Sequence, residues 1–583
     1  MNHAITETAR MPFWPGITWK TFAQWLFAIC ITIVILAPVA VVLINGFDVA
    51  PPYQGFQFGF GNWNEAWENP QIGAALWNTV SIVLIRAFLG FVIAIPLAWL
   101  VARTDMPFSK GLEFGFWIAF FMPNLAFVQG WSFLLEGYRG VLNQLIQTIP
   151  YFENFSVDIY SYWGIIWVHL MAQNISSVFI LLVLGFRNMD SSLEEAARTS
   201  GASKFRTLRN IVLPLSRPMI AMIAVLGIIR GVQSYEIEAI LGGPAAIDVY
   251  STILVRMLQT EPPLIAEGSA LSALVLLALV PLIILQRLYV GRRQYVTVGS
   301  KMRVGLIELG RWRWLAFAIV LFIVLLQTLV PFLSVLAGSF MKRWGFFHIP
   351  NPWTLDRWKA VLGHERFLDA LWNTLVLGVT SGLAAGIICF FVAHILVRTN
   401  FRARKVLEFV SWLPWAIPGV LLSMGLVTVV LEIPPLRFMY GSMFILVVAM
   451  VLFRFPLGVQ LLQSGLMQVN KELEEASTIC GGSHMITQRR INIPILMPML
   501  TAVGLMTFVT AINEVSGVVL LASTDLRTLS LLSLDYLIGT QTEPESAAVI
   551  TTVMILICVG VALIARMFGI SLGGTPAPTG ENK

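Results

Sequence analysis

Charged residues are scarce in this sequence. Of its 583 residues, 12% are Asp, Glu, Lys or Arg and 57% are hydrophobic, whereas soluble globular domains carry roughly 25% charged residues. The mean hydropathy of +0.78 agrees with this bias. A soluble chain of this length would need a far larger polar fraction to cover its surface, so the composition excludes a soluble enzyme and predicts an integral membrane protein.

Cysteines are also few. Cys30, Cys389 and Cys558 lie in apolar runs, and Cys480 lies in a predicted cytoplasmic loop. No extracytoplasmic disulfide framework is therefore expected.

The dipeptide Gly-Lys is absent, which excludes the Walker loop that binds nucleotide phosphates. No His, Cys, Asp or Glu residues have metal-ligand spacing, and no catalytic constellation is present, so we expect neither a metal nor a cofactor in this chain.

Long apolar runs are abundant, and each run of about 20 residues predicts a membrane-spanning helix. Twelve are predicted, at 21–45, 76–102, 112–135, 160–186, 215–240, 264–290, 313–338, 371–397, 405–431, 436–463, 496–521 and 545–567. The first run is too long for a cleaved signal peptide. Prolines interrupt 112–135 and 405–431. The expected fold is an all-α polytopic membrane protein.

The two parts of the chain repeat each other. Three motifs recur at equivalent places: Trp77-Asn78-Thr79 with Trp372-Asn373-Thr374, Arg103-Thr104 with Arg398-Thr399, and Glu195-Ala196-Ala197 with Glu475-Ala476-Ser477. Six spans in each copy place both copies in the membrane the same way round. We therefore predict two halves, 1–300 with a core at 76–290 and 301–583 with a core at 371–567.

The third motif lies in a loop after the fourth span of each half. Acidic residues suit the first turn of a helix, Gly201 and Gly481 permit a bend with positive φ, and Pro214 and Pro494 suit the start of the next helix. The loops are therefore predicted to form a short helix, a sharp turn and a second short helix on one face of the membrane.

This pattern, Glu-Ala-Ala, three residues, Gly, nine residues and Ile-x-Leu-Pro, resembles the "EAA" coupling loop of permease subunits of binding-protein-dependent ABC importers of type I. The resemblance implies a transport subunit without enzyme activity, two separate ATPase subunits that bind the ATP, and an extracytoplasmic substrate-binding protein. It implies a coupling site that faces the ATPase subunits, made of Glu195, Ala196, Ala197, Gly201, Pro214, Glu475, Ala476, Ser477, Gly481 and Pro494.

Basic residues predict the orientation. The loop 46–75 has no Lys or Arg, whereas 292–313 and 398–405 are basic, and basic loops stay cytoplasmic. Both termini are therefore expected on the cytoplasmic side of a bacterial inner membrane. The net charge of +6 needs no nucleic-acid partner, because no basic patch with interleaved aromatic residues is present.

Ionisable residues within spans are functional candidates. Five carboxylates lie near the ends of equivalent spans: Glu236, Glu238, Glu267, Glu514 and Glu545. They either line a cation path or bond to neighbouring helices, and the sequence leaves both interpretations open. Arg454, beside Pro456, is predicted to pair with another helix.

The stretches 235–244 and 249–252, and the fusion of two halves, resemble the ferric-iron importer permeases. Ferric iron is therefore the expected substrate. Thiamine, phosphonate and polyamine permeases share the same scaffold and remain alternatives. A secondary transporter with parallel six-span repeats would also show twelve spans, but it has no reason to carry the two loops.

Overall fold

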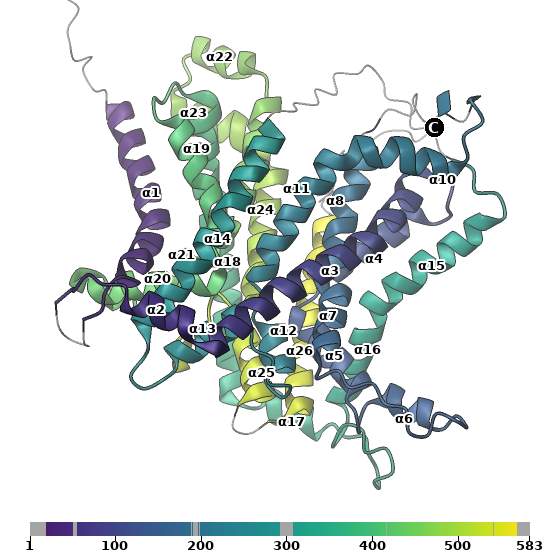
Figure 1. Ribbon diagram of the computed structural model, residues 1–583. Coiled ribbons are helices and arrows are strands. Elements are labelled where there is room, and N and C mark those ends of the chain that lie inside the picture. Colours follow the sequence, from purple (N-terminus) through teal and green to yellow (C-terminus); the bar gives the residue numbers. More distant parts are fainter. Residues whose placement is uncertain are drawn as a thin grey trace, which may run out of the picture.

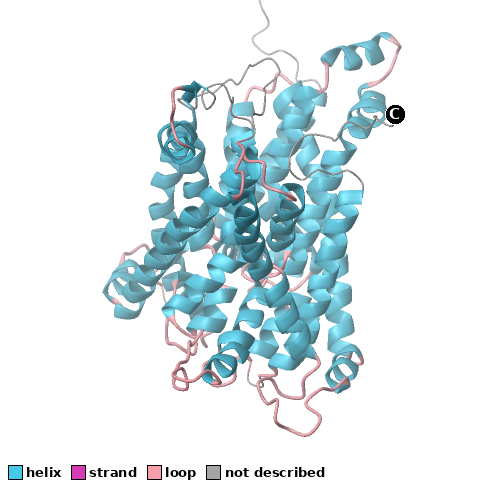
Figure 2. Cartoon of the chain, turned by 90° about the vertical axis from the view of Figure 1, so that its right-hand side faces the viewer, coloured by secondary structure: helices cyan, strands magenta, loops and turns pink. Residues whose placement is uncertain are grey.

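The computed structural model describes residues 19–50, 55–187, 189, 196–197, 199–291, 307–415, 417–539 and 542–567. Helices run between two ends of the molecule (Figures 1 and 2). We call the end with α22 (Lys471–Ile479) and α23 (His484–Thr487) the loop end, which is uppermost in Figure 1. The end with α6 (Val141–Gln147) and α17 (Asp356–Leu362) is the opposite end.

The helices of the first half follow one another in the order that the sequence predicts. They are α1 (Trp19–Asn45), α2 (Gly61–Glu68), α3 (Pro70–Arg103), α4 (Ser109–Phe121), α5 (Asn124–Leu135), α6, α7 (Tyr162–His169), α8 (Ile175–Arg187), α10 (Lys204–Thr207), α11 (Leu213–Val232), α12 (Glu236–Gly242), α13 (Tyr250–Leu258) and α14 (Ile265–Gly291). A π-helical turn, Leu170–Asn174, joins α7 to α8.

The second half follows the same plan. Its helices are α15 (Trp312–Gln327), α16 (Leu329–Ser339), α17, α18 (Glu365–Arg398), α19 (Arg404–Trp412), α20 (Gly419–Glu432), α21 (Met443–Gln468), α22, α23, α24 (Ile493–Asn513), α25 (Leu529–Ile538) and α26 (Pro544–Met567). Short 3₁₀ turns occupy Leu413–Trp415, Pro434–Met439 and Thr524–Leu526.

Ten helices in the described ranges are long and apolar enough to cross a membrane, and the number reaches twelve when two bent pairs each count as one span. The pairs are α4 with α5, bent by 96°, and α19–Trp415 with α20, bent by 111°. They are the two runs that proline was predicted to interrupt. Pro123 and Pro418 stand directly before α5 and α20, and proline has no N–H to continue a helix. The all-α polytopic fold is confirmed.

Several predicted ends are wrong by a few residues. α21 begins at Met443 rather than at 436, because the prolines at 434 and 435 start a 3₁₀ turn. α11 ends at Val232 and α24 ends at Asn513, so the runs 215–240 and 496–521 overshoot. The hydropathy continues there because α12 and the turns at 514–521 are also apolar and largely buried.

The repeated Trp-Asn-Thr motif has one structural role in both halves. Near the start of α3, the Thr79 hydroxyl accepts a hydrogen bond from the Tyr250 N–H at 2.8 Å. In α18, Thr374 accepts from the Leu529 N–H at 2.8 Å. The preceding asparagine donates to a carbonyl in the same loop in each half. Each motif therefore anchors the short helix that follows the fifth span, α13 or α25.

The first span of each half packs against the other half. α1 contacts α20 as well as α14, and α16 contacts α5 as well as α26. Glycine permits both close approaches. A Cβ on Gly130 of α5 would lie 2.6 Å from the Cα atom of Pro331, and a Cβ on Gly425 of α20 would clash with Pro38 of α1. α1 and α15–α16 consequently flank opposite sides of the bundle (Figure 1).

Candidate coupling loops and central path

The second predicted coupling loop forms two short helices joined by a bend. α22 begins after Asn470, whose side chain accepts a hydrogen bond from the Glu472 N–H. α23 follows after the bend at Gly481, where φ is +81°. The equivalent Gly201 also has a φ of +81°, so the predicted positive φ is confirmed at both glycines. An added Cβ would meet no atom within 4 Å at either site. The backbone conformation, rather than space, therefore requires glycine.

The predicted coupling residues lie at the loop end. Glu475 and Ala476 are exposed on α22, and Ser477 is half-buried with its hydroxyl 2.8 Å from that of Thr487 on α23. In the first loop, Ala196 is exposed and Ala197 is half-buried, while Glu195 lies outside the described residues.

Large apolar side chains are exposed beside the second bend. Ile479 is 86% exposed, and Met485 is 70% exposed. Ile479 ends α22, outside the candidate spans, whereas Met485 lies at the start of the candidate span His484–Asn513. The sequence motif did not include these two residues, although their positions two residues before Gly481 and three residues after Gly482 could have indicated them.

The loops join the fifth spans through matching irregular turns. π-helical turns occupy Leu208–Val212 and Gln488–Asn492, and Pro214 and Pro494 lie in the first turns of α11 and α24. Proline lacks the N–H that would bond four residues back, so the backbone widens just before it. Each loop thus passes directly into a long span.

Arginine at the end of the second span of each half holds the start of the loop. Arg398 ends α18, and its Nη2 donates to the carbonyls of Leu466 and Val469 at 2.9 and 2.6 Å. Its Nε lies 2.8 Å from Oε1 of Glu474 on α22, and these side chains are 5% and 21% exposed. Arg103, its counterpart, donates to the Met189 carbonyl at 3.2 Å. The sequence shows this Arg-Thr repeat but not its role.

The fifth span of each half contacts the broken span of the other. The Asn513 side-chain amide at the end of α24 donates to the Phe121 carbonyl at 3.2 Å. Its counterpart Gln233, just after α11, donates to the Trp415 carbonyl at 3.1 Å. Each acceptor lies at a break in a span, where a carbonyl has lost its helical partner. The two amides therefore link the halves at equivalent points.

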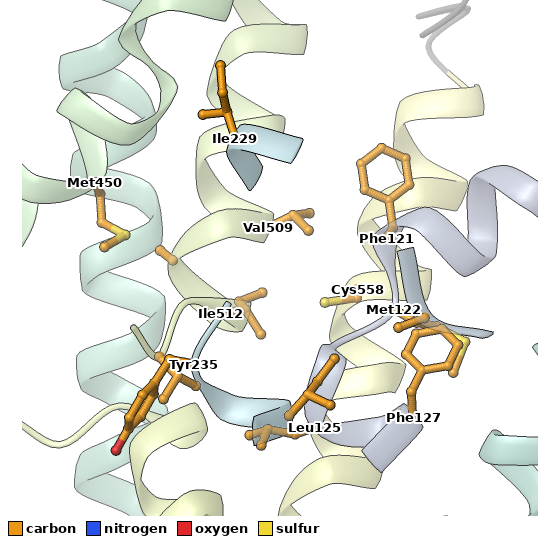
Figure 3. Close-up of a cluster of buried hydrophobic side chains, with 14 of the residues drawn as sticks. Phe121, Met122, Leu125, Phe127, Ile229, Tyr235, Met450, Val509, Ile512 and Cys558 are labelled. Carbon is orange, nitrogen blue, oxygen red and sulfur yellow. The ribbon is translucent and has the colours of Figure 1, made fainter. Parts of the chain in front are cut away.

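Apolar side chains from both halves fill the centre between these links (Figure 3). Ile229 and Tyr235 come from the first half, and Val509 and Ile512 come from α24; all four are buried. Leu125 at the start of α5 lies beside them. Figure 3 shows Ile229 above and Tyr235 below in this cluster, which we call the central layer.

Two of the predicted carboxylates bond to neighbouring elements. Glu238 lies 2.7 Å from Nε2 of His169, and Nδ1 of this histidine accepts a hydrogen bond at 2.6 Å from Arg86. A guanidinium group can only donate, so the other ring nitrogen donates to Glu238. Glu545 accepts from the Trp344 N–H at 2.7 Å. For these two, the structure favours the helix-bonding interpretation.

Glu236 and Glu514 come from opposite halves and lie near enough to interact electrostatically. Glu236 accepts from the Asn124 amide at 2.7 Å, and Glu514 accepts from the Ser516 hydroxyl at 2.6 Å and the Gly517 N–H at 2.9 Å. Glu267 is half-buried in the first turn of α14, apart from this pair. Among the described residues, no group of three or more His, Cys, Asp or Glu could hold a metal ion.

Two arginines lie within the apolar helices α11 and α21. The Arg454 Nε atom on α21 donates to the Thr510 hydroxyl on α24, so the predicted pairing with another helix is confirmed. Arg230 lies in the last turn of α11 and is exposed, whereas Arg454 is half-buried.

A duplicated bundle of membrane spans with a matching bent loop in each half is the architecture of a membrane transport permease. The chain belongs to the family of binding-protein-dependent transport system inner membrane components, which matches residues 11–294 and 378–570. It is therefore a multi-pass inner-membrane permease of the ABC importer class, with the family unit present twice.

Curated relatives include ferric transport permeases. The chain is 27% identical over 467 residues to the ferric transport system permease protein FbpB of Actinobacillus pleuropneumoniae. It is 28% identical over 399 residues to the putative ferric transport system permease protein FbpB 1 of Haemophilus influenzae. These matches cover 77% and 68% of this chain but 64% and 62% of the relatives. The probable ABC transporter permease protein y4fN of Sinorhizobium fredii is 25% identical, with 95% of this chain and 97% of the relative covered.

Proposed function

We propose that this permease forms the substrate path of an ATP-driven importer and that residues 195–214 and 475–494 each dock one separate ATPase subunit. The observation that carries the proposal is the matched geometry of the two loops. Both bend at a glycine with a φ of +81°, and each continues through a π-helical turn into a fifth span. A movement imposed on either loop would reach the central layer along α11 or α24.

The loop end is then cytoplasmic, together with both termini, as the basic loops 292–313 and 398–405 indicate. The opposite end receives the substrate from an extracytoplasmic binding protein. ATP binds to the ATPase subunits, because this sequence has no Gly-Lys dipeptide and hence no Walker loop.

Reconstitution tests this proposal. The purified chain alone should hydrolyse no ATP. Addition of the ATPase subunit and the loaded binding protein should give hydrolysis that depends on all three components. Robust hydrolysis by the chain alone, or normal coupling after deletion of 475–481, would contradict the assignment of the loops.

Ferric iron is the proposed substrate. Its support is the similarity to ferric transport permeases and the two carboxylates Glu236 and Glu514, which follow the fifth spans α11 and α24. Uptake of radioactive iron by proteoliposomes with the complete transporter should exceed uptake of thiamine, a phosphonate or a polyamine. Preferred uptake of one of those solutes would show that this solute, rather than ferric iron, is the substrate. Uptake that continues without ATP would indicate a secondary transporter.

A further inference from the structure

An apolar groove runs along the seam between α18 and α24, which pack against each other in the second half (Figure 1). Its volume is about 710 Å³, within the range of roughly 300–1,000 Å³ typical of ligand sites. Leu383 and Ile387 on one rim and Met497 on the other are 64%, 57% and 55% exposed. Both helices are candidate membrane spans, so the groove faces lipid rather than water.

Glycines form the floor of the groove. Gly378, Gly382 and Gly386 line it and recur every four residues, on one face of α18. All three are buried. A Cβ on Gly382 would lie 2.8 Å from the carbonyl oxygen of Gly504 on α24, so the two backbones approach closely there. The missing side chains leave the space that the exposed rims enclose.

The loop end of the groove is polar. His394, one turn before the end of α18, and His484, at the start of α23, line it together with Gln488. The two histidine rings meet edge to face, with their centroids 5.2 Å apart. His394 is buried, whereas His484 is exposed. His484 is therefore the ring that a ligand at this end would reach first.

Basic residues lie beside this polar end. Arg489 and Arg490 are exposed in the π-helical turn after α23, and neither this turn nor α23 contains Asp or Glu. The acidic residues of the loop belong to α22. One of them, Glu474, reaches the turn through Asn492, but its carboxylate is paired with Arg398 at 2.8 Å. This arrangement of charge suits a phosphate group at the surface of a membrane.

The repeated scaffold does not require this lining. The Trp-Asn-Thr and Arg-Thr motifs align α3 with α18 at an offset of 295 residues, which places Val83, Ala87 and Phe91 where α18 has its three glycines. The same offset places Trp99 where α18 has His394. The groove is therefore built from residues that distinguish the second half from the first.

The length of the groove matches one leaflet of a bilayer. His394 follows Gly378 by 16 residues, a distance of about 24 Å at 1.5 Å per residue. Half of a bilayer with its headgroups measures roughly 20–22 Å. We propose that the groove binds one anionic phospholipid of the leaflet on the loop side, with an acyl chain along the glycines and the phosphate at His484.

Native mass spectrometry of the full chain, purified in detergent and titrated with lipid, tests this site. The probes are phosphatidylglycerol, which is anionic, and phosphatidylcholine with the same acyl chains, which carries no net charge. We expect one phosphatidylglycerol to bind at least about fivefold more tightly than phosphatidylcholine, the factor that one basic residue near an anionic headgroup supplies. Equal affinity for the two lipids would overturn the proposal.

Gly386→Leu fills the groove. A Cβ at this position would meet no atom nearer than 4.0 Å, so the new side chain enters the groove without forcing the helices apart. Each methylene kept out of the groove weakens binding about fourfold, and we expect both lipids to lose affinity about tenfold or more. Gly227→Leu is the matched control, because Gly227 lies in the fifth span of the first half with equally open space.

Unchanged affinity for both lipids in Gly386→Leu, or an equal loss in Gly227→Leu, would overturn the proposal. If Gly386→Leu fails to fold, Thr501→Phe narrows the same groove from α24, where Thr501 is exposed, and should weaken binding in the same way. A wild-type dimer that Gly386→Leu converts to a monomer would show that a second copy of this chain, rather than lipid, fills the groove.

A charge variant tests the place of the phosphate. Arg489→Gln combined with Arg490→Gln should abolish the preference for phosphatidylglycerol and leave the affinity for phosphatidylcholine nearly unchanged. Arg256→Gln is the control, because Arg256 is exposed on α13 and paired with Asp248. An unchanged preference in the double variant would overturn the headgroup position. These measurements need neither ATPase subunits nor substrate, so their outcome is independent of the proposed function.

Discussion

Single residues determine the shape of the coupling loops. At Gly201 and Gly481 the backbone has a φ of +81°, which a β-branched residue adopts only as an outlier. A Cβ added at either position would have open space around it. Any effect of a substitution therefore comes from the backbone and is confined to an exposed loop.

Replacement of Gly481 by Val should strain the bend by about 1–3 kcal/mol and reduce ATPase docking and transport, while expression stays near normal. Gly201→Val should do the same, and the double variant should be no better than the worse single one, because transport needs both loops. Gly73→Val is the control, since that site is equally open but lacks a positive φ. Uptake assays at matched protein levels test this prediction. Near-wild-type uptake by both single variants would refute the coupling role.

The ion pair of Arg398 and Glu474 gives a second prediction at this scale. Glu474→Gln leaves the guanidinium with only its carbonyl partners, at a cost of about 1–3 kcal/mol. We expect faster amide hydrogen exchange in α22 and weaker coupling of ATP hydrolysis to the binding protein. Glu472→Gln is the control on the same helix, because Glu472 is exposed and its carboxylate accepts a hydrogen bond from the neighbouring Asn470. Equal exchange rates in both variants would show that the pair does not hold the helix.

At the scale of elements, the breaks in two spans are the distinctive feature. A continuous helix would satisfy its own carbonyls, but the breaks at Pro123 and Pro418 free some of them. Asn513 and Gln233 then bond to these carbonyls from the other half. The contact between the halves thus depends on acceptors that only a broken span provides.

Asn513→Leu should remove this link and leave the Phe121 carbonyl unsatisfied, at a cost of about 1–3 kcal/mol in the conformation observed here. We expect ATP hydrolysis that no longer depends on the binding protein, because the arrangement of the halves that these bonds hold loses stability. Gln233→Leu should have the same effect, because it leaves the Trp415 carbonyl without its bond to the Gln233 amide. Asn143→Leu is the control for stability, since Asn143 is buried and bonded within the first half. Coupled hydrolysis in both link variants would contradict the prediction.

Much of the element order could be predicted from sequence, and the reasons are local. Apolar runs indicate spans because lipid offers the backbone no partner, and proline indicates the two breaks. The ends of α11 and α24 could not be predicted, because α12 and the turns at 514–521 that follow them are also apolar. The motif likewise predicts the bends at Gly201 and Gly481. The bonds of Asn513 to Phe121 and of Gln233 to Trp415 could not be predicted, because hydropathy does not show which helix faces meet across halves.

At the scale of the whole molecule, the internal repeat supplies two loops from one polypeptide. One copy of the chain should therefore assemble with two ATPase subunits. Native mass spectrometry of the detergent-solubilised complex should give this one-to-two ratio, and limited proteolysis between residues 292 and 306 should leave it unchanged. A complex with two permease chains would show that the halves of one chain do not form one pathway.

The exchange of first spans between halves has a consequence for biosynthesis. α1 is synthesised long before α20, against which it packs, because α20 begins about 370 residues after α1 ends. At about 5–20 residues per second, α1 waits roughly 20–75 s for that partner. It can meet α14 earlier, because α14 also contacts it. α16, by contrast, finds α5 already made, so the second half assembles on a finished surface while the first half completes its packing late.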